Sequence, residues 1–125
     1  MNIIQLPAAA AIKLNPGEHY AGPLLDAEGN VMHHVVLLPD RPNRKVNWQV
    51  AMYWAASVGG RLPNRQEQAL LYANCSPHLQ PDWYWSSERH GSTSIWCCDF
   101  SDGRQNRSHE RFENLAVAVR ILELT

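Results

Sequence analysis

The sequence predicts an α+β fold in which two helices are segregated from an antiparallel sheet. Two pairs of strand-like segments are each joined by a short turn, two capped helical segments lie between the pairs, and an apolar segment closes the chain. A chain of 125 residues has the size of one ordinary domain. We therefore expect a single domain over residues 1–125, with an N-terminal arm over residues 1–16 and the N- and C-terminal strands in one sheet.

The first expected hairpin follows this arm. Within the arm, residues 3–6 are a short strand candidate, and the alanine run after them is compatible with a helical turn or an extended edge. Residues 19–25 and 31–38 are strand-like and flank a five-residue turn that contains glycine. The second strand is apolar on both faces after His34, which is typical of a buried sheet position.

Two helices are expected next, each with a recognisable start. Asn47 is a plausible N-cap for a helix through residue 58, which Gly59 and Gly60 end. Its buried face is expected to comprise the apolar residues at helical spacing, Trp48, Ala51, Met52, Ala55 and Val58. Asn64 and Glu67 have the spacing of a capping box for a second helix, which carries Leu70, Leu71 and Ala73 and should stop before Pro77. Residues 76–82 are expected to be a loop.

A tryptophan-rich hairpin is expected over residues 83–100, with residues 88–94 as its connection. By strand alternation Trp83 and Trp85 share one face and Tyr84 takes the other. The polar stretch 105–114 lacks apolar alternation, so we expect it to pair loosely or to loop. Residues 115–122 form the strongest strand pattern, apolar on both faces apart from Arg120, which predicts a central position in the sheet.

Composition excludes several function classes. The formal net charge of -1 provides no global basic field, so no nucleic-acid partner and no membrane surface is expected. The first apolar run, 8–12, has neither the flanks of a signal peptide nor the length of a spanning helix. Three cysteines, two of them adjacent, do not make a disulfide framework, and buried reduced thiols are expected.

Several segments also resemble a known family. They are GGRLPNRQEQALLYAN at residues 59–74, WYWSSE at 83–88, Trp96-Cys97 with Asp99-Phe100, AVAVR at 116–120, and, upstream, GEHYAG at 17–22 with the two histidines at 33–34. Over about residues 17–122 the sequence resembles phage and prophage members of the Lcl C-terminal-domain-like family. The resemblance implies a fold similar to the C-type lectin fold, and it does not specify an activity.

Metal and catalytic sites are not predicted. The Trp-Asn-Asp and Glu-Pro-Asn type motifs of calcium-dependent lectins are absent, and the carboxylates Asp82, Glu88, Asp99 and Asp102 are too dispersed for a calcium site. His33 and His34 point to opposite faces of a strand, where one of them could pair with His19 across the hairpin. No positional signature selects a nucleophile and base among Ser86, Ser87, Cys97, His90 and His109. We expect no enzyme activity, no metal and no cofactor.

A second set of residues is expected to have structural roles. An arginine inside an apolar strand must be paired, and Glu67 or Glu88 are the expected partners of Arg120. Trp85 and Trp96 are expected to contribute mainly to the hydrophobic core of the hairpin.

The candidate binding residues lie in two polar loops, 89–94 and 104–111: Arg89, His90, Arg104, Arg107, His109 and Arg111. Arginine and aromatic side chains are enriched in binding hot spots, and the resemblance implies that this half of the fold presents the ligand surface. Solvated polar loops are the alternative. We expect a phage- or prophage-encoded binding module for a protein or glycan, located in the host cytoplasm or the virion. The alternatives are a structural component of a phage particle or an accessory protein that binds and inhibits a host defence complex. A homo-oligomer is also compatible with the sequence.

Overall fold

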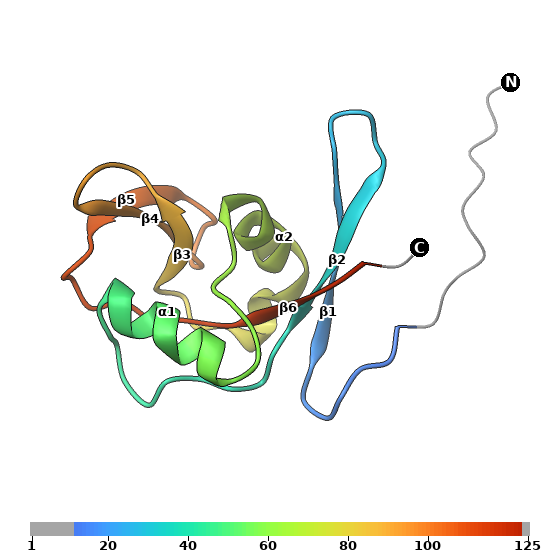
Figure 1. Cartoon of the computed structure of the whole chain (residues 1–125), viewed down its shortest axis with the longest axis horizontal. Coiled ribbons are helices and arrows are strands. Elements are labelled where there is room, and N and C mark those ends of the chain that lie inside the picture. Colours follow the sequence, from blue (N-terminus) through green and yellow to red (C-terminus); the bar gives the residue numbers. More distant parts are fainter. Residues whose placement is uncertain (1–11, 124–125) are drawn as a thin grey trace, which may run out of the picture.

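The computed structural model describes residues 12–123 and shows a small α+β arrangement of two helices and two three-stranded antiparallel sheets (Figure 1). The expected α+β class is therefore confirmed. The first sheet has the order β1-β2-β6 and the second has the order β3-β4-β5. Helix α2 lies between the two sheets (Figure 1). The strand candidate at residues 3–6, and most of the expected arm, lie outside the described residues.

The first sheet is built from β1 (His19–Leu25), β2 (Val31–Leu37) and β6 (Val119–Leu122). Both expected hairpin strands are confirmed, and the turn between them closes through a hydrogen bond from the Asp26 amide to the Asn30 carbonyl of 2.8 Å. The strands nearest the two chain ends lie in the same sheet, as expected.

The prediction that residues 115–122 form a central strand is wrong. Strand β6 has only four residues and lies at the edge of the sheet, while β2 is central. Residues before it cross from one sheet to the other: Leu115 bridges Tyr84 in parallel, and the Ala118 carbonyl accepts from the Leu38 amide at 3.0 Å. This segment is apolar on both faces because it runs between two halves of the core.

Helix α1 (Trp48–Ser57) begins as expected, because the Asn47 side chain accepts a hydrogen bond from the Val50 amide at 3.0 Å. Gly59 follows the helix at φ +85°, a conformation that glycine adopts without steric cost. Ala51 and Ala55 are buried. Met52 was expected on the same buried face, and this is wrong, since its side chain points outward and is exposed.

Helix α2 (Arg65–Cys75) has the predicted capping box between Asn64 and Glu67 and ends before Pro77. Leu71 is buried, and the predicted loop after the helix contains a 3-10 turn, η1 (Ser76–His78).

The second sheet contains β3 (Trp83–Arg89), β4 (Ser94–Asp99) and β5 (Gln105–His109). The tryptophan hairpin is confirmed, with Trp85 opposite Cys97. The expectation that residues 105–114 pair loosely or loop is wrong for β5, which pairs with β4 over five residue pairs. A strand at a sheet edge needs only backbone partners, so its side chains can be polar and exposed without apolar alternation.

Two hydrophobic clusters share the interior, and strand alternation divides side chains between them. Tyr84, Cys98 and Val117 belong to the first cluster, whereas Trp85 and Cys97 belong to the second. Trp83 packs against the second cluster, which confirms that Trp83 and Trp85 share a face and Tyr84 takes the other. Neighbouring cysteines likewise point to opposite faces, and all three cysteines are free and buried.

Among residues 12–123, no helix has the length and apolar character needed to cross a membrane.

Candidate functional site

The second sheet and the start of α2 bring one aromatic residue and three basic or imidazole side chains together. The Arg65 guanidinium lies 3.6 Å from the centroid of the Trp96 ring, and the His90 ring meets the same indole edge-on at 5.0 Å. Arg107, which pairs with Trp96 across β4 and β5, places Nη1 3.5 Å from His90 Nε2. We call Arg65, His90, Trp96 and Arg107 the Trp96 cluster.

The Trp96 cluster is held by neighbouring polar contacts. Arg65 Nε donates to Gln105 Oε1 at 2.8 Å, and Gln105 Nε2 donates back to the Arg65 carbonyl at 2.8 Å. Trp96 was expected to be core, and it is only half-buried, because its ring lies under Arg65 on the side of the sheet that faces solvent. The first turn of α2 thereby contributes Arg65, which sequence reasoning missed. Arg65 begins a helix that is followed in the sequence by an aromatic hairpin, and this position is the pattern from which its contact with Trp96 could have been predicted.

Arg89 is largely occupied by contacts within the protein. Its guanidinium lies 4.9 Å from the Trp48 ring, its Nη1 donates to the Ser92 carbonyl at 2.7 Å, and its Nη2 lies 3.3 Å from Glu110 Oε2. These contacts join the β3–β4 connection to the start of α1. Arg89 therefore has a structural role in addition to its exposed position.

Arg104 lies apart from the Trp96 cluster, beside Trp83. It pairs with Asp102 at 2.7 Å and Asp99 at 3.6 Å, and its guanidinium is 6.0 Å from the Trp83 ring. A small cavity of about 190 Å³ opens near Trp83 and is also lined by the exposed ring of Phe112.

His109 ends β5, and Arg111 lies in the turn that follows it. His109 Nδ1 accepts a hydrogen bond from the Arg111 amide at 3.1 Å, and both side chains are exposed. The six predicted binding residues thus divide into four groups: His90 and Arg107 in the Trp96 cluster, Arg89 beside Trp48, Arg104 beside Trp83, and His109 with Arg111 at the end of β5 and in the turn after it.

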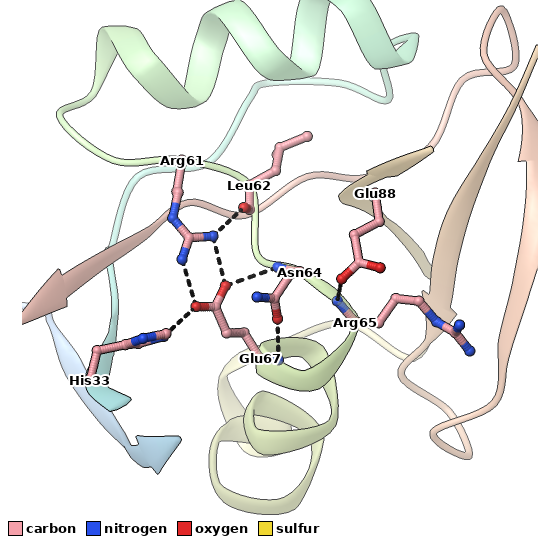
Figure 2. Close-up of polar contacts among 7 residues, drawn as sticks. All are labelled: His33, Arg61, Leu62, Asn64, Arg65, Glu67 and Glu88. Carbon is pink, nitrogen blue, oxygen red and sulfur yellow. Dashed lines mark hydrogen bonds and ion pairs between the residues drawn. The ribbon is translucent and has the colours of Figure 1, made fainter. Parts of the chain in front are cut away.

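A buried polar network surrounds Glu67 (Figure 2). The carboxylate of Glu67 is fully buried and accepts two hydrogen bonds from Arg61, at 2.8 and 2.7 Å, and one from the Asn64 amide at 2.9 Å. His33 Nε2 lies 2.7 Å from Glu67 Oε2 and must carry the proton, because a carboxylate only accepts. The network ties β2, the loop before α2 and α2 itself together, which is a structural role.

This arrangement corrects the prediction for the histidines. His33 contacts Glu67, and His34 Nδ1 lies 2.7 Å from the Tyr20 hydroxyl. His19 does not pair with either of them, since its ring stacks on His78 at 3.5 Å.

The predicted partners of Arg120 are also wrong. Arg120 binds Glu18 through two hydrogen bonds of 2.9 and 2.8 Å. Glu18 directly precedes β1, two strands away from β6, so only the sheet order brings the two residues together. Glu88 instead accepts a hydrogen bond from the Arg65 amide at 3.1 Å and so satisfies the first turn of α2 (Figure 2).

Within residues 12–123, no three histidine, cysteine or acidic side chains are grouped closely enough to hold a metal ion. Burial raises the pKa of the Cys97 thiol to about 12 and that of Cys98 to about 11, so both thiols are protonated at neutral pH.

Comparisons of the chain with protein-family models and with curated protein sequences find no match.

Proposed function

We propose that this protein is a non-enzymatic binding module, with a C-type-lectin-like fold and a phage or prophage origin, that recognises a protein or a glycan. The recognition surface is centred on the Trp96 cluster and bordered by residues 89–94, which connect β3 to β4, and by residues 104–111, which include β5. The observation that carries the proposal is a half-buried tryptophan with the Arg65 guanidinium over its ring face and the His90 ring edge-on against it. Tryptophan and arginine are the side chains most enriched in binding hot spots.

The geometry supports binding in two further ways. Trp96 is already oriented by Arg65 and His90, so little side-chain freedom remains to be lost when a partner docks. Arg107 forms no ion pair with an acidic side chain among the described residues, whereas Arg89 pairs with Glu110 and Arg104 pairs with Asp102. Arg111 likewise forms no ion pair among the described residues, but it lies in the turn after β5 and not in the Trp96 cluster. Arg107 is therefore the predicted arginine that combines a place in the Trp96 cluster with a guanidinium available to an acceptor on a partner.

The experiment uses the immobilised full chain, a host-cell lysate and a glycan array. Wild type is compared with Arg107→Ala and with the control Arg44→Ala, whose exposed arginine lies in the 39–45 loop. We expect Arg107→Ala to lower specific retention about tenfold, as loss of a hydrogen-bonded arginine anchor does, with Arg44→Ala like wild type. Thermal unfolding of each variant checks that it is folded. Equal retention by wild type and Arg107→Ala would show that the surface is wrong.

A second candidate function is favoured by helix α1. No charged residue occurs between Val46 and Gly60, and the outer face of the helix exposes Val50, Met52 and Tyr53. Surface helices ordinarily have charged residues on that face, and contiguous exposed apolar groups mark interaction sites. The alternative is thus a particle component that assembles through a permanent interface on α1.

Sedimentation measured over a range of protein concentrations separates the two candidates. The alternative requires an oligomer at low concentration that Tyr53→Glu dissociates, because the substitution places a charge in the interface. A monomer at every concentration excludes it.

A further inference from the structure

A second, larger cavity lies on a part of the molecule that shares no residue with the Trp96 cluster. It has a volume of about 350 Å³ and opens between the loop after β2, the η1 turn and residues 115–116. This volume is within the usual range of small-molecule sites. Its walls include Pro42, Pro77 and Leu115, and its polar lining includes Arg41, His78 and Tyr84.

Arg41 supplies a fixed positive charge at this cavity. Its Nη1 donates to the carbonyls of Leu38 at 2.6 Å and of Asp40 at 2.8 Å, which anchors one side of the guanidinium. The remaining guanidinium hydrogens have no acceptor among the described residues. Arg41 lines the cavity and is itself exposed to solvent. An arginine so placed stays charged at physiological pH.

Tyr84 supplies a hydrogen-bond donor. The side chain is buried, with 2% of the residue exposed, and its oxygen accepts a hydrogen bond from the Gln80 amide at 2.9 Å. The hydroxyl hydrogen has no acceptor among the described residues, although a buried donor is ordinarily satisfied. Burial raises the pKa of Tyr84, so the hydroxyl keeps its proton at neutral pH. A ligand oxygen in the cavity would satisfy it.

The lining as a whole is complementary to an anion that has an apolar body. A guanidinium, an imidazole and a phenol line the cavity, and none of the described lining residues is acidic. Asp40, the acidic neighbour of Arg41, is not part of the lining. Arginine binds a carboxylate through paired hydrogen bonds, while proline and leucine walls favour apolar groups.

We propose that this cavity is a binding site for a carboxylate attached to a small apolar group, with Arg41 and Tyr84 as its hydrogen-bond donors. Two sources share this chemistry, a free small organic acid and the C-terminal residue of a peptide. Inorganic phosphate carries the charge without the apolar body and would leave the proline and leucine walls uncovered.

The test follows the amide signals of the full isotope-labelled chain by NMR during titration with three probes. Benzoate has the required carboxylate and ring, benzamide has the same shape without the charge, and phosphate has the charge without the ring. We expect benzoate to shift the amides of Gln80, Leu115 and Ala116 with a Kd of about 1 mM or lower, as suits so small a ligand. Benzamide and phosphate are expected to bind at least about tenfold more weakly.

Two variants and a matched control complete the test. Arg41→Gln is expected to weaken benzoate binding about tenfold and Tyr84→Phe about threefold, whereas Arg44→Gln, in the same loop but outside the lining, is expected to leave it unchanged. The probe comparison on wild type needs no variant to fold. The proposal is overturned if benzoate causes no shifts at these amides, if benzamide binds equally well, or if Arg44→Gln weakens binding as much as Arg41→Gln.

A pentapeptide ending in phenylalanine, with a free or an amidated C-terminus, distinguishes the two sources. If the free-acid peptide binds at least as tightly as benzoate and the amidated peptide does not, the site takes a peptide C-terminus. If benzoate alone binds, the site takes a free small acid. Because the cavity shares no residue with the Trp96 cluster, these results are independent of those for Arg107→Ala.

Discussion

Glu67 illustrates at the scale of one residue how a carboxylate can be fully buried. It is neutralised by Arg61 and receives further hydrogen bonds from His33 and the Asn64 amide. A buried charge is tolerated only when it is both paired and hydrogen-bonded. The capping-box spacing revealed one of these contacts in the sequence, but no local pattern links Glu67 to a histidine on a strand 34 residues earlier.

Replacing Glu67 with glutamine should lower the free energy of unfolding by about 3 kcal/mol, because it removes the charge that Arg61 and His33 face inside the protein. Urea unfolding followed by tryptophan fluorescence measures the change. Glu113→Gln, at an exposed position, serves as the control and should change stability by less than about 0.5 kcal/mol. Equal effects of the two substitutions would contradict a structural role for the network.

The Glu18–Arg120 pair should make the stability of the protein depend on pH in the acidic range. Hydrogen bonds from Arg120 hold the pKa of Glu18 below its ordinary value of 4.5. A carboxyl group with a lowered folded-state pKa contributes stability that is fully present above the unfolded-state pKa and is lost as the pH falls through the folded-state pKa. Wild type should therefore be more stable than Glu18→Gln at about neutral pH. The difference in the free energy of unfolding between the two proteins should shrink as the pH falls below 4.5.

Denaturant unfolding of both proteins across this pH range measures that difference. Other carboxylates with lowered pKa, such as Asp82 and Asp99, are present in both proteins and cancel. A difference that stays constant down to strongly acidic pH would show that Glu18 is not stabilised in its ionised form.

At the scale of elements, the connection from α1 to the first sheet depends on close backbone approach. A Cβ atom on Gly60 would lie 2.6 Å from the Val119 carbonyl oxygen and 2.9 Å from Leu38 Cδ1. The next amide, that of Arg61, donates to the same Val119 carbonyl at 3.0 Å. Gly59 differs, because a Cβ there would meet no atom within 4 Å and only its φ of +85° favours glycine.

Gly60→Ala should therefore destabilise the protein by about 2 kcal/mol through the steric conflict, and Gly59→Ala by about 1 kcal/mol through backbone strain alone. Differential scanning calorimetry of the two variants compares them directly. If Gly59→Ala destabilises the protein more than Gly60→Ala does, the close packing of position 60 on β6 is not the reason that glycine is needed there.

At the scale of the whole molecule, strand alternation joins the two hydrophobic clusters into one interior. Cys75 and Cys98 lie in the first cluster, and Cys97 lies in the second. Because β3, β4 and residues 116–119 contribute side chains to both clusters, neither can lose its packing without disturbing the other. The protein should therefore unfold as one cooperative unit.

The three thiols report on this cooperativity. In the native protein they should be unreactive toward a disulfide reagent, because they are buried and their pKa values are raised. In increasing urea, all three should become reactive over the same concentration range as the fluorescence transition. Mass spectrometry of the labelled peptides identifies each cysteine, and labelling of Cys97 well before Cys98 would show that the clusters unfold separately.

Local patterns in the sequence were sufficient for both hairpins, both helix caps and the division of Trp85 from Tyr84, because turns, caps and strand alternation depend on residues a few positions apart. They did not reveal that β5 pairs through its backbone, or that residues 115–118 run between two clusters. The partners of Arg120, His33 and Trp96 were likewise decided by the tertiary structure, since sheet order and the placement of α2 bring together residues up to 102 positions apart. Contacts of that kind arise only when the elements pack. The sequence alone therefore pointed to residues 89–94 and 104–111, but it revealed neither the Trp96 cluster nor the Arg41 cavity.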